Sequence, residues 1–291
     1  MRTRIFFLSL LLLVSIVGAG FKPALTVHCP LSTVLCLVTA VAQETSLYKV
    51  PSIPDGEVRK LKVRYEDPKL NDAYFAGKPI NQRILHDEAT SSIETIVKFK
   101  GEGSARQLVY TRNETLHNRA LSTWDFTFLP GDRLVLSTIE HRIKTPAGKQ
   151  IRHEFFDLTD PIFHYPSDSF HAYVLEVFFR TLPLQVGYKN QFHLWLAPKA
   201  IMRMMISVEK TEILKTPAGD IECFVIQMTP NVEDFLGKAG KLIQPLVPKF
   251  TFWTTVKGTH PVIKYRGPLG EVNLVGAPIE VHDLTSISPA P

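Results

Sequence analysis

Short runs of β-branched and aromatic residues, separated by turn residues, recur along most of this chain. Typical runs are VRKLKVRY (58–65), WDFTF (124–128) and FTFWTTV (250–256). Turn residues such as Pro130-Gly131-Asp132 and Lys257-Gly258 end these runs. Roughly a dozen such segments lie too close together in the sequence for helical crossovers between most of them. We therefore predict an all-β fold: an antiparallel curved sheet or an incompletely closed β-barrel, with one or two covering helices.

Two segments show the apolar spacing of helices instead. The first follows Ser167 or Asp168, either of which can serve as N-cap, and ends at Pro183. The second begins after Asn231 and ends before Pro245. We expect both helices to lie over the mouth of the curved sheet. An apolar ligand would then be lined by large side chains of these helices and of a nearby strand, namely Phe178, Phe179, Leu182, Phe235, Leu236, Leu242 and Trp253.

The pentapeptide Lys-Thr-Pro-Ala-Gly occurs twice, at 144–148 and at 215–219. Proline at the second position of a type I turn and glycine at the fourth fit the loop of a β-hairpin. We therefore predict a hairpin turn at each copy. In the first copy, the predicted register places His141 opposite His153, on one face shared with Ile139, Ile143, Ile151 and Phe155.

His141 and His153 form the sharpest candidate for a metal site. Two imidazoles on facing strands could bind zinc or copper if His164 or Asp157 supplied a third ligand. Two half-buried histidines between the charged and apolar sides of a hairpin are the simpler interpretation, so we predict no metal and no other cofactor. The sequence has no Gly-x-Ser-x-Gly, His-Glu-x-x-His or glycine-rich phosphate-binding motif, and we predict no catalytic residue.

The N-terminal segment has the composition of an export signal. Basic residues precede an apolar run over 5–21, and a second apolar run ends in small residues at 40–42. We expect cleavage of this signal peptide after Ala42 and a periplasmic location. Cleavage after Ala19 is one alternative. Retention of the first run as a membrane anchor is another, because about 17–25 apolar residues can span a bilayer.

The rest of the chain is predicted to form a loose lead-in at 43–56, a single β-rich domain at 57–285 and a disordered tail at 286–291. The leader holds three of the 33 basic residues and none of the 28 acidic ones, so the remainder is nearly balanced in charge. We therefore expect no nucleic-acid binding, which needs a clustered basic excess. Outside the leader, Cys223 is the one cysteine. Its apolar, strand-like surroundings predict a buried, inert thiol.

The second half of the chain resembles a known family. The resemblance rests on turn and core residues in a fixed order, which are Tyr173-Val-Leu, Arg180-Thr-Leu-Pro-Leu, Gly187, Thr216-Pro-Ala-Gly, Cys223-Phe-Val-Ile, Phe252-Trp253, His260-Pro261-Val262 and Gly270-Glu-Val. In this order the chain is similar to the bacterial exported proteins grouped as the domain of unknown function 3108 (DUF3108) family, from Val58 to Leu284. The resemblance implies an antiparallel β-structure in the periplasm. More loosely, such proteins are similar to the curved β-sheets that carry lipoproteins or lipids between bacterial membranes.

Three functional hypotheses follow. The first, which we favour, is a non-enzymatic periplasmic or cell-envelope protein that binds a lipid or other apolar ligand, or an envelope partner. The second is an envelope enzyme that acts on polysaccharide or lipid through acidic or histidine residues gathered by the fold. The third is a structural component of an envelope complex that associates through an exposed sheet edge. A dry cavity would favour the first hypothesis, and a polar cleft with clustered carboxylates the second. A flat apolar patch would favour the third.

Overall fold

The computed structural model describes residues 48–66, 90–116, 119–160, 162–163, 166, 168–197, 200–217, 219–247, 249–268 and 279–288. The chain divides into two compact units, Met1–Ala42 and Gln43–Pro291, and every described residue belongs to the second. The expected leader, with its cleavage sites, and His164 therefore lie outside the described residues. In the described ranges, no helix combines the length and the apolar character needed to cross a membrane.

Within these residues, thirteen strands form one sheet in the order β6-β5-β4-β3-β2-β1-β13-β12-β11-β10-β9-β8-β7. The bounds of the strands are β1 (Val58–Tyr65), β2 (Thr90–Lys100), β3 (Gln107–Leu116), β4 (Leu121–Phe128), β5 (Leu136–Lys144), β6 (Gln150–Asp157), β7 (Ser169–His171), β8 (Lys189–Ala197), β9 (Ala200–Thr216), β10 (Gly219–Pro230), β11 (Phe250–Thr255), β12 (Val262–Pro268) and β13 (Ile279–Ser288). The last strand thus continues into the expected tail.

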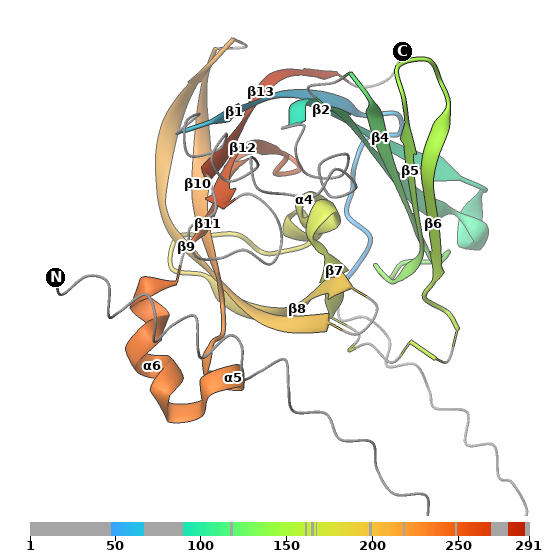
Figure 1. The fold of residues 1–291 in the computed structure, drawn as a ribbon. Coiled ribbons are helices and arrows are strands. Elements are labelled where there is room, and N and C mark those ends of the chain that lie inside the picture. Colours follow the sequence, from blue (N-terminus) through green and yellow to red (C-terminus); the bar gives the residue numbers. More distant parts are fainter. Residues whose placement is uncertain are drawn as a thin grey trace, which may run out of the picture. The chain divides into compact units, whose positions relative to one another are not determined.

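The strand order follows the chain in a circle. Each strand pairs with the next one in sequence, and β1 pairs with β13, but β6 and β7 do not pair and form the two edges of the described sheet. Neighbouring strands are antiparallel except β7 and β8, which are parallel. The sheet curves strongly (Figure 1). The described strands therefore form an incompletely closed β-barrel that is mainly antiparallel, which confirms the predicted fold class.

The segment between β6 and β7 explains why the barrel is open. Its sequence contains Pro161 and Pro166, and proline has no N–H to donate to a neighbouring strand. β7 has only three residues, and its parallel pairing with β8 requires a crossover connection. That crossover contains the helix α4 (Leu175–Phe179), which lies inside the curve of the sheet (Figure 1).

The first predicted helix is shorter than expected. Residues 169–171 pair with β8 as β7, and a 3-10 turn at Ala172–Val174 precedes α4. Asp168 does not cap this turn, because its carboxylate lies 2.7 Å from Nδ1 of His193 on β8. The side chain of His171 accepts the capping hydrogen bond instead, from the N–H of Tyr173. Strand pairing has therefore taken the place of the first predicted helical turn.

The second predicted helix is broken in two. It forms α5 (Glu233–Leu236) and α6 (Gly240–Ile243), which are joined by a 3-10 turn at Gly237–Ala239. Gly237 has a φ of 53°, which only glycine adopts readily, and this conformation ends α5. The two short helices lie outside the curve that contains α4 (Figure 1). Of the predicted helices, α4 is therefore the one that covers the inner face of the sheet.

Both copies of the pentapeptide form hairpin turns, as predicted, between β5 and β6 and between β9 and β10. In the first hairpin the predicted register holds for one pair and then shifts by one residue, because Ile151 forms a bulge. This shift reverses the faces of all later residues of β6. His141 lies opposite Glu154 rather than His153, so the predicted facing pair of histidines is wrong.

The inner face of the sheet and α4 together form the inner core. Phe178 and Phe179 of α4 are fully buried there. The ring centroid of Phe178 lies 4.5 Å from that of Phe170 and 4.7 Å from that of Phe192. The ring centroid of Phe179 lies 4.8 Å from that of Phe252. The expected lead-in also contributes to this core, since the ring of Tyr48 packs edge-on against Phe178, and Ile53 is buried. A second, smaller cluster of buried residues includes Leu61, Cys223, Val225 and Trp253.

Candidate functional site

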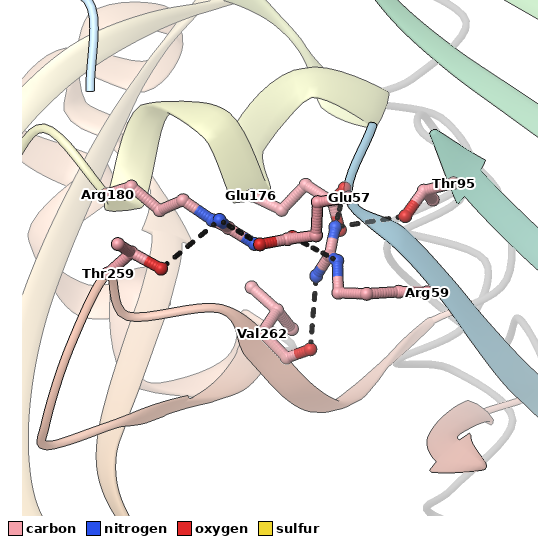
Figure 2. Close-up of polar contacts among 7 residues, drawn as sticks. All are labelled: Glu57, Arg59, Thr95, Glu176, Arg180, Thr259 and Val262. Carbon is pink, nitrogen blue, oxygen red and sulfur yellow. Dashed lines mark hydrogen bonds and ion pairs between the residues drawn. The ribbon is translucent and has the colours of Figure 1, made fainter. Parts of the chain in front are cut away.

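Four charged side chains, three of them buried and one nearly so, hold α4 inside the sheet (Figure 2). We call Glu57, Arg59, Glu176 and Arg180 the ion-pair cluster. Glu57 directly precedes β1 and Arg59 lies near its start, whereas Glu176 lies in α4 and Arg180 directly follows it. The side chains of Glu57, Arg59 and Arg180 are at most 4% exposed, and that of Glu176 is 11% exposed. Charged groups are seldom buried to this degree unless they are paired.

Arg180 binds Glu57 through both of its terminal nitrogens. Nη2 donates to Oε1 at 2.5 Å, and Nη1 donates to Oε2 at 3.1 Å. This bidentate arrangement is the strongest that arginine makes with a carboxylate. Nη1 also lies 3.5 Å from Oγ1 of Thr259, in the connection between β11 and β12. The end of α4 is therefore joined to two distant parts of the sheet.

Arg59 connects α4 with three strands. Its guanidinium pairs with Glu176 and donates to Thr95 Oγ1 at 3.1 Å and to the carbonyl oxygen of Val262 at 3.3 Å, while Nε lies 3.3 Å from Glu57. Burial, followed by the nearby charge of Arg180, lowers the pKa of Arg59 to about 10. Arg59 thus remains protonated at neutral pH. Two cations and two anions make the cluster neutral, as the low dielectric of a protein interior requires.

The pairing within the cluster determines what it can do chemically. Each carboxylate forms an ion pair with at least one guanidinium, and each guanidinium with at least one carboxylate. In this conformation none of the four groups is free to act on a substrate. The cluster attaches α4 to β1 above the apolar inner face of the sheet.

Aromatic side chains span the open side of the sheet, and we call this group the aromatic seam. Trp124 of β4 stacks on His141 of β5 with ring centroids 3.6 Å apart, and lies 5.3 Å from His171 of β7. Phe156 of β6 lies 5.6 Å from Trp195 of β8. The strands on the two sides of the opening are therefore joined by side-chain packing where the described sheet has no backbone pairing.

Both histidines of the seam are neutral at neutral pH. Burial lowers the pKa of His141 to about 4, although a hydrogen bond with Glu154 opposes the shift. Burial, followed by the charge of Arg112, lowers the pKa of His171 to about 3. The hydrogen bond from the N–H of Tyr173 requires an unprotonated Nδ1 on His171, in agreement with this direction.

The structure does not bring the predicted metal ligands together. His141 is buried on the inner face, whereas His153 lies on the outer face, where its side chain is 48% exposed and 3.0 Å from Glu140. Asp157 also belongs to the outer row of β6. In the part of the chain that the structure describes, no group of three or more histidine, cysteine, aspartate or glutamate side chains could hold a metal ion.

The predicted lining residues fall into separate places. Three of them lie together in the inner core, namely Phe178, Phe179 and Leu182. Trp253 belongs to the smaller buried cluster, and its indole N–H donates to Glu212. Leu242 is 82% exposed, and Leu236 is partly exposed. The side chain of Phe235 lies outside what the structure describes.

Sequence reasoning missed the ion-pair cluster. A signal for one member was present, because Arg59 alternates with Leu61 and Val63 and so occupies an apolar position of an amphipathic strand. The partners of these charges could not be deduced, since Glu57 and Arg180 are 123 residues apart in the chain.

The fold and this site define an incompletely closed β-barrel that surrounds an internal helix, which is held by buried ion pairs. Residues 144–264 match the model of a family described as "Protein of unknown function (DUF3108)". The match confirms the family resemblance inferred from turn and core residues, over the segment from the first hairpin turn to β12. No curated protein matches the chain.

Several solved structures are similar to this chain. One is a candidate lipoprotein from Parabacteroides distasonis, with 11% identity, a TM-score of 0.33, and coverage of 84% of this chain and 99% of that chain. Another is a beta-barrel-like protein of the domain of unknown function DUF1849 from Brucella abortus, with 7% identity, a TM-score of 0.31 and coverage of 84% and 99%. A third is the Mycobacterium tuberculosis lipoprotein LppX, with 10% identity, a TM-score of 0.28 and coverage of 81% and 87%.

Proposed function

We propose that this protein is exported and works in the periplasm or cell envelope by binding an apolar ligand, such as the acyl chain of a lipid, without catalysis. The ligand would occupy the space on the inner face of the sheet that α4 fills in the structure. One observation carries this proposal. The apolar inner face is covered by a helix of only five residues, and charged side chains contribute to its attachment.

The inner face offers the surface that such a ligand needs. Four of the five residues of α4 are buried, and they pack against aromatic rings of the sheet, including Phe170, Phe192 and Phe252. If α4 moved away, these rings would be exposed to water. Each Å² of exposed apolar surface would cost about 25 cal/mol of free energy. An acyl chain that took the place of α4 would cover the same surface and remove that cost.

The ion-pair cluster makes this movement less costly than it would be for an entirely apolar helix. Charged groups regain their hydration when they leave the protein interior, which offsets much of the attraction that they lose. Glu176 and Arg180 would leave with α4, whereas Glu57 and Arg59 would stay with β1 and can pair with each other across 3.3 Å. The two halves of the cluster are therefore each neutral after separation.

The N-terminal sequence supports export, because its basic start, apolar runs and small residues at 40–42 are typical of signal peptides. Cleavage after Ala42 remains part of the proposal. It would release Gln43–Pro291, the compact unit that contains the described sheet.

Weakening the attachment of α4 tests the proposed mode of binding. Arg180→Lys keeps the charge but loses the bidentate contact with Glu57, so displacement of α4 should require less energy. We expect this variant to bind a pyrene-labelled fatty acid more tightly than the wild-type protein in a fluorescence titration. Arg203→Lys, at an exposed ion pair with Asp234, is the matched control. Unchanged or weaker binding by Arg180→Lys would contradict displacement of α4.

A further inference from the structure

β6 is an edge strand with an apolar outer row. The bulge at Ile151 sets the side chains of Ile151, His153 and Phe155 on the outer face, where Ile151 is 42% exposed and Phe155 is 58% exposed. β6 stands at the end of the described sheet, and β5 is its partner among the described strands. An unprotected edge with exposed apolar side chains is a ready site for pairing with another strand.

The backbone groups of β6 that have no partner strand among the described residues belong to the same outer row. The N–H of Leu158 donates to the carbonyl oxygen of Ser137, on the β5 side. Alternate residues of an antiparallel strand direct their N–H and C=O groups to the same neighbour. Residues 152, 154 and 156 therefore face β5 with their backbone groups, and those of His153 and Phe155 point to the open edge.

We propose that two copies of this protein associate by antiparallel pairing of their β6 strands, about a twofold axis through His153. In this register Ile151 of each copy lies opposite Phe155 of the other on the outer face. Arg152 of each copy lies opposite Glu154 of the other on the inner face. The interface is thus self-complementary in both apolar and charged side chains, as a twofold interface must be.

The charges of β6 select this register over its neighbours. A shift that moves the axis to Arg152 places the two Arg152 side chains opposite each other. A shift that moves it to Glu154 does the same for two carboxylates. Like charges directly opposite in a sheet are destabilising. A register intermediate between two of these would place outer residues of one copy opposite inner residues of the other. The two sheets would then not share the same outer face. Of these neighbouring registers, the one with its twofold axis at His153 therefore satisfies both rows.

The expected association is weak and reversible. A single pair of eight-residue strands makes a small interface, at or below the roughly 1,200 Å² that marks the lower end of specific interfaces. Sedimentation equilibrium of the exported protein, produced from the full chain, should therefore show a monomer–dimer equilibrium over a concentration series. A monomer at every concentration up to the millimolar range would overturn the proposal.

Charge reversal tests the register. Arg152→Glu and Glu154→Arg should each weaken dimerisation at least tenfold, because each sets like charges opposite one another in both symmetry-related pairs. The combined variant R152E/E154R restores opposite charges and should recover the dimer. Circular dichroism verifies that each variant is folded. A dimer that is unaffected by the single reversals, or not recovered in the combined variant, would overturn the proposed register.

A disulfide at the axis provides an independent test. Facing residues of antiparallel strands have Cα atoms about 4.5–5.5 Å apart, within the range of a disulfide. Oxidised His153→Cys protein should form a covalent dimer on a non-reducing gel. Ile213→Cys is the matched control, because Ile213 lies on β9 and is 67% exposed. Equal cross-linking of the two variants, or no cross-link at His153→Cys, would overturn the proposal.

Discussion

Arg180, directly after the internal helix α4, is joined to Glu57 by two hydrogen bonds of 2.5 and 3.1 Å, although the two residues are 123 positions apart in the chain. Glu57 precedes β1, which pairs with β13 and so joins the beginning and the end of the strand circle. The pair therefore fastens the crossover helix to the part of the sheet where the two ends of the domain meet.

We expect Arg180→Ala to lower the free energy of unfolding by about 3–5 kcal/mol, because it leaves the carboxylate of Glu57 buried without its main partner. Arg203→Ala removes one side of an exposed bidentate pair with Asp234 and should change stability by less than about 1 kcal/mol. Urea unfolding followed by circular dichroism measures both. Equal effects of the two substitutions would show that burial does not distinguish the ion-pair cluster.

Stability should fall as the pH is lowered from about 6.5 towards 5. The folded-state pKa values of His141 and His171, about 4 and about 3, lie below the value near 6.5 expected in the unfolded chain. The unfolded chain therefore binds more protons in this range, and each histidine contributes a slope of up to about 1.4 kcal/mol per pH unit. The contribution of the two neutral histidines to stability is fully present above pH 6.5.

His171→Asn tests the assignment of this pH dependence. The substitution removes one titrating group and leaves a side-chain oxygen that can accept from the N–H of Tyr173. We expect the slope between pH 6.5 and 5 to decrease by about half. A wild-type stability that does not vary over this range would contradict neutral, buried histidines.

Shortening a buried side chain of α4 should lower stability far more than shortening an exposed side chain of α6. Phe178→Ala removes a fully buried ring from the inner core and is expected to cost about 3–5 kcal/mol in unfolding free energy. Leu242→Ala alters a side chain that is 82% exposed and should stay within about 0.5 kcal/mol of wild type. Thermal unfolding of the two variants provides the measurement. A large effect of Leu242→Ala would indicate that α6 covers apolar surface.

Cys223 should be unreactive while the protein is folded. It is fully buried, and burial followed by the charges of Glu212 and Glu222 raises its pKa to about 11. Labelling with a thiol reagent at pH 8, followed by peptide mass analysis, should modify Cys223 only at the rate of unfolding. Ile213→Cys, at an exposed position of β9, should be labelled at least a hundred times faster. Comparable rates would contradict the buried position of the thiol.

Local patterns in the sequence were sufficient to predict the class of fold. Alternation of apolar residues and the spacing of turn residues indicated short antiparallel strands, and the repeated pentapeptide indicated two hairpins. Both are present, because each depends on residues that are neighbours in the chain. The apolar spacing after Ala172 likewise indicated α4, although the pairing of β7 with β8 shortened the helix.

Features that depend on long-range contacts could not be predicted in the same way. The bulge at Ile151 reversed the face of β6 and separated His141 from His153, because a shift of one residue is invisible in a pattern that repeats every two. The ion-pair cluster joins segments from β1, α4 and β12. Of these, only the misplaced charge of Arg59 on an apolar face gave a signal.

Native mass spectrometry of the protein, expressed from its full-length gene and purified from a bacterial periplasm, tests the central claim most directly. We expect a stoichiometric adduct with the mass of a lipid, which disappears after organic extraction and leaves the folded chain. The lipid-bound form should also exchange the backbone hydrogens of α4 faster than the extracted form. A chain that carries no adduct before extraction, and binds none when lipid micelles are added, would contradict the account.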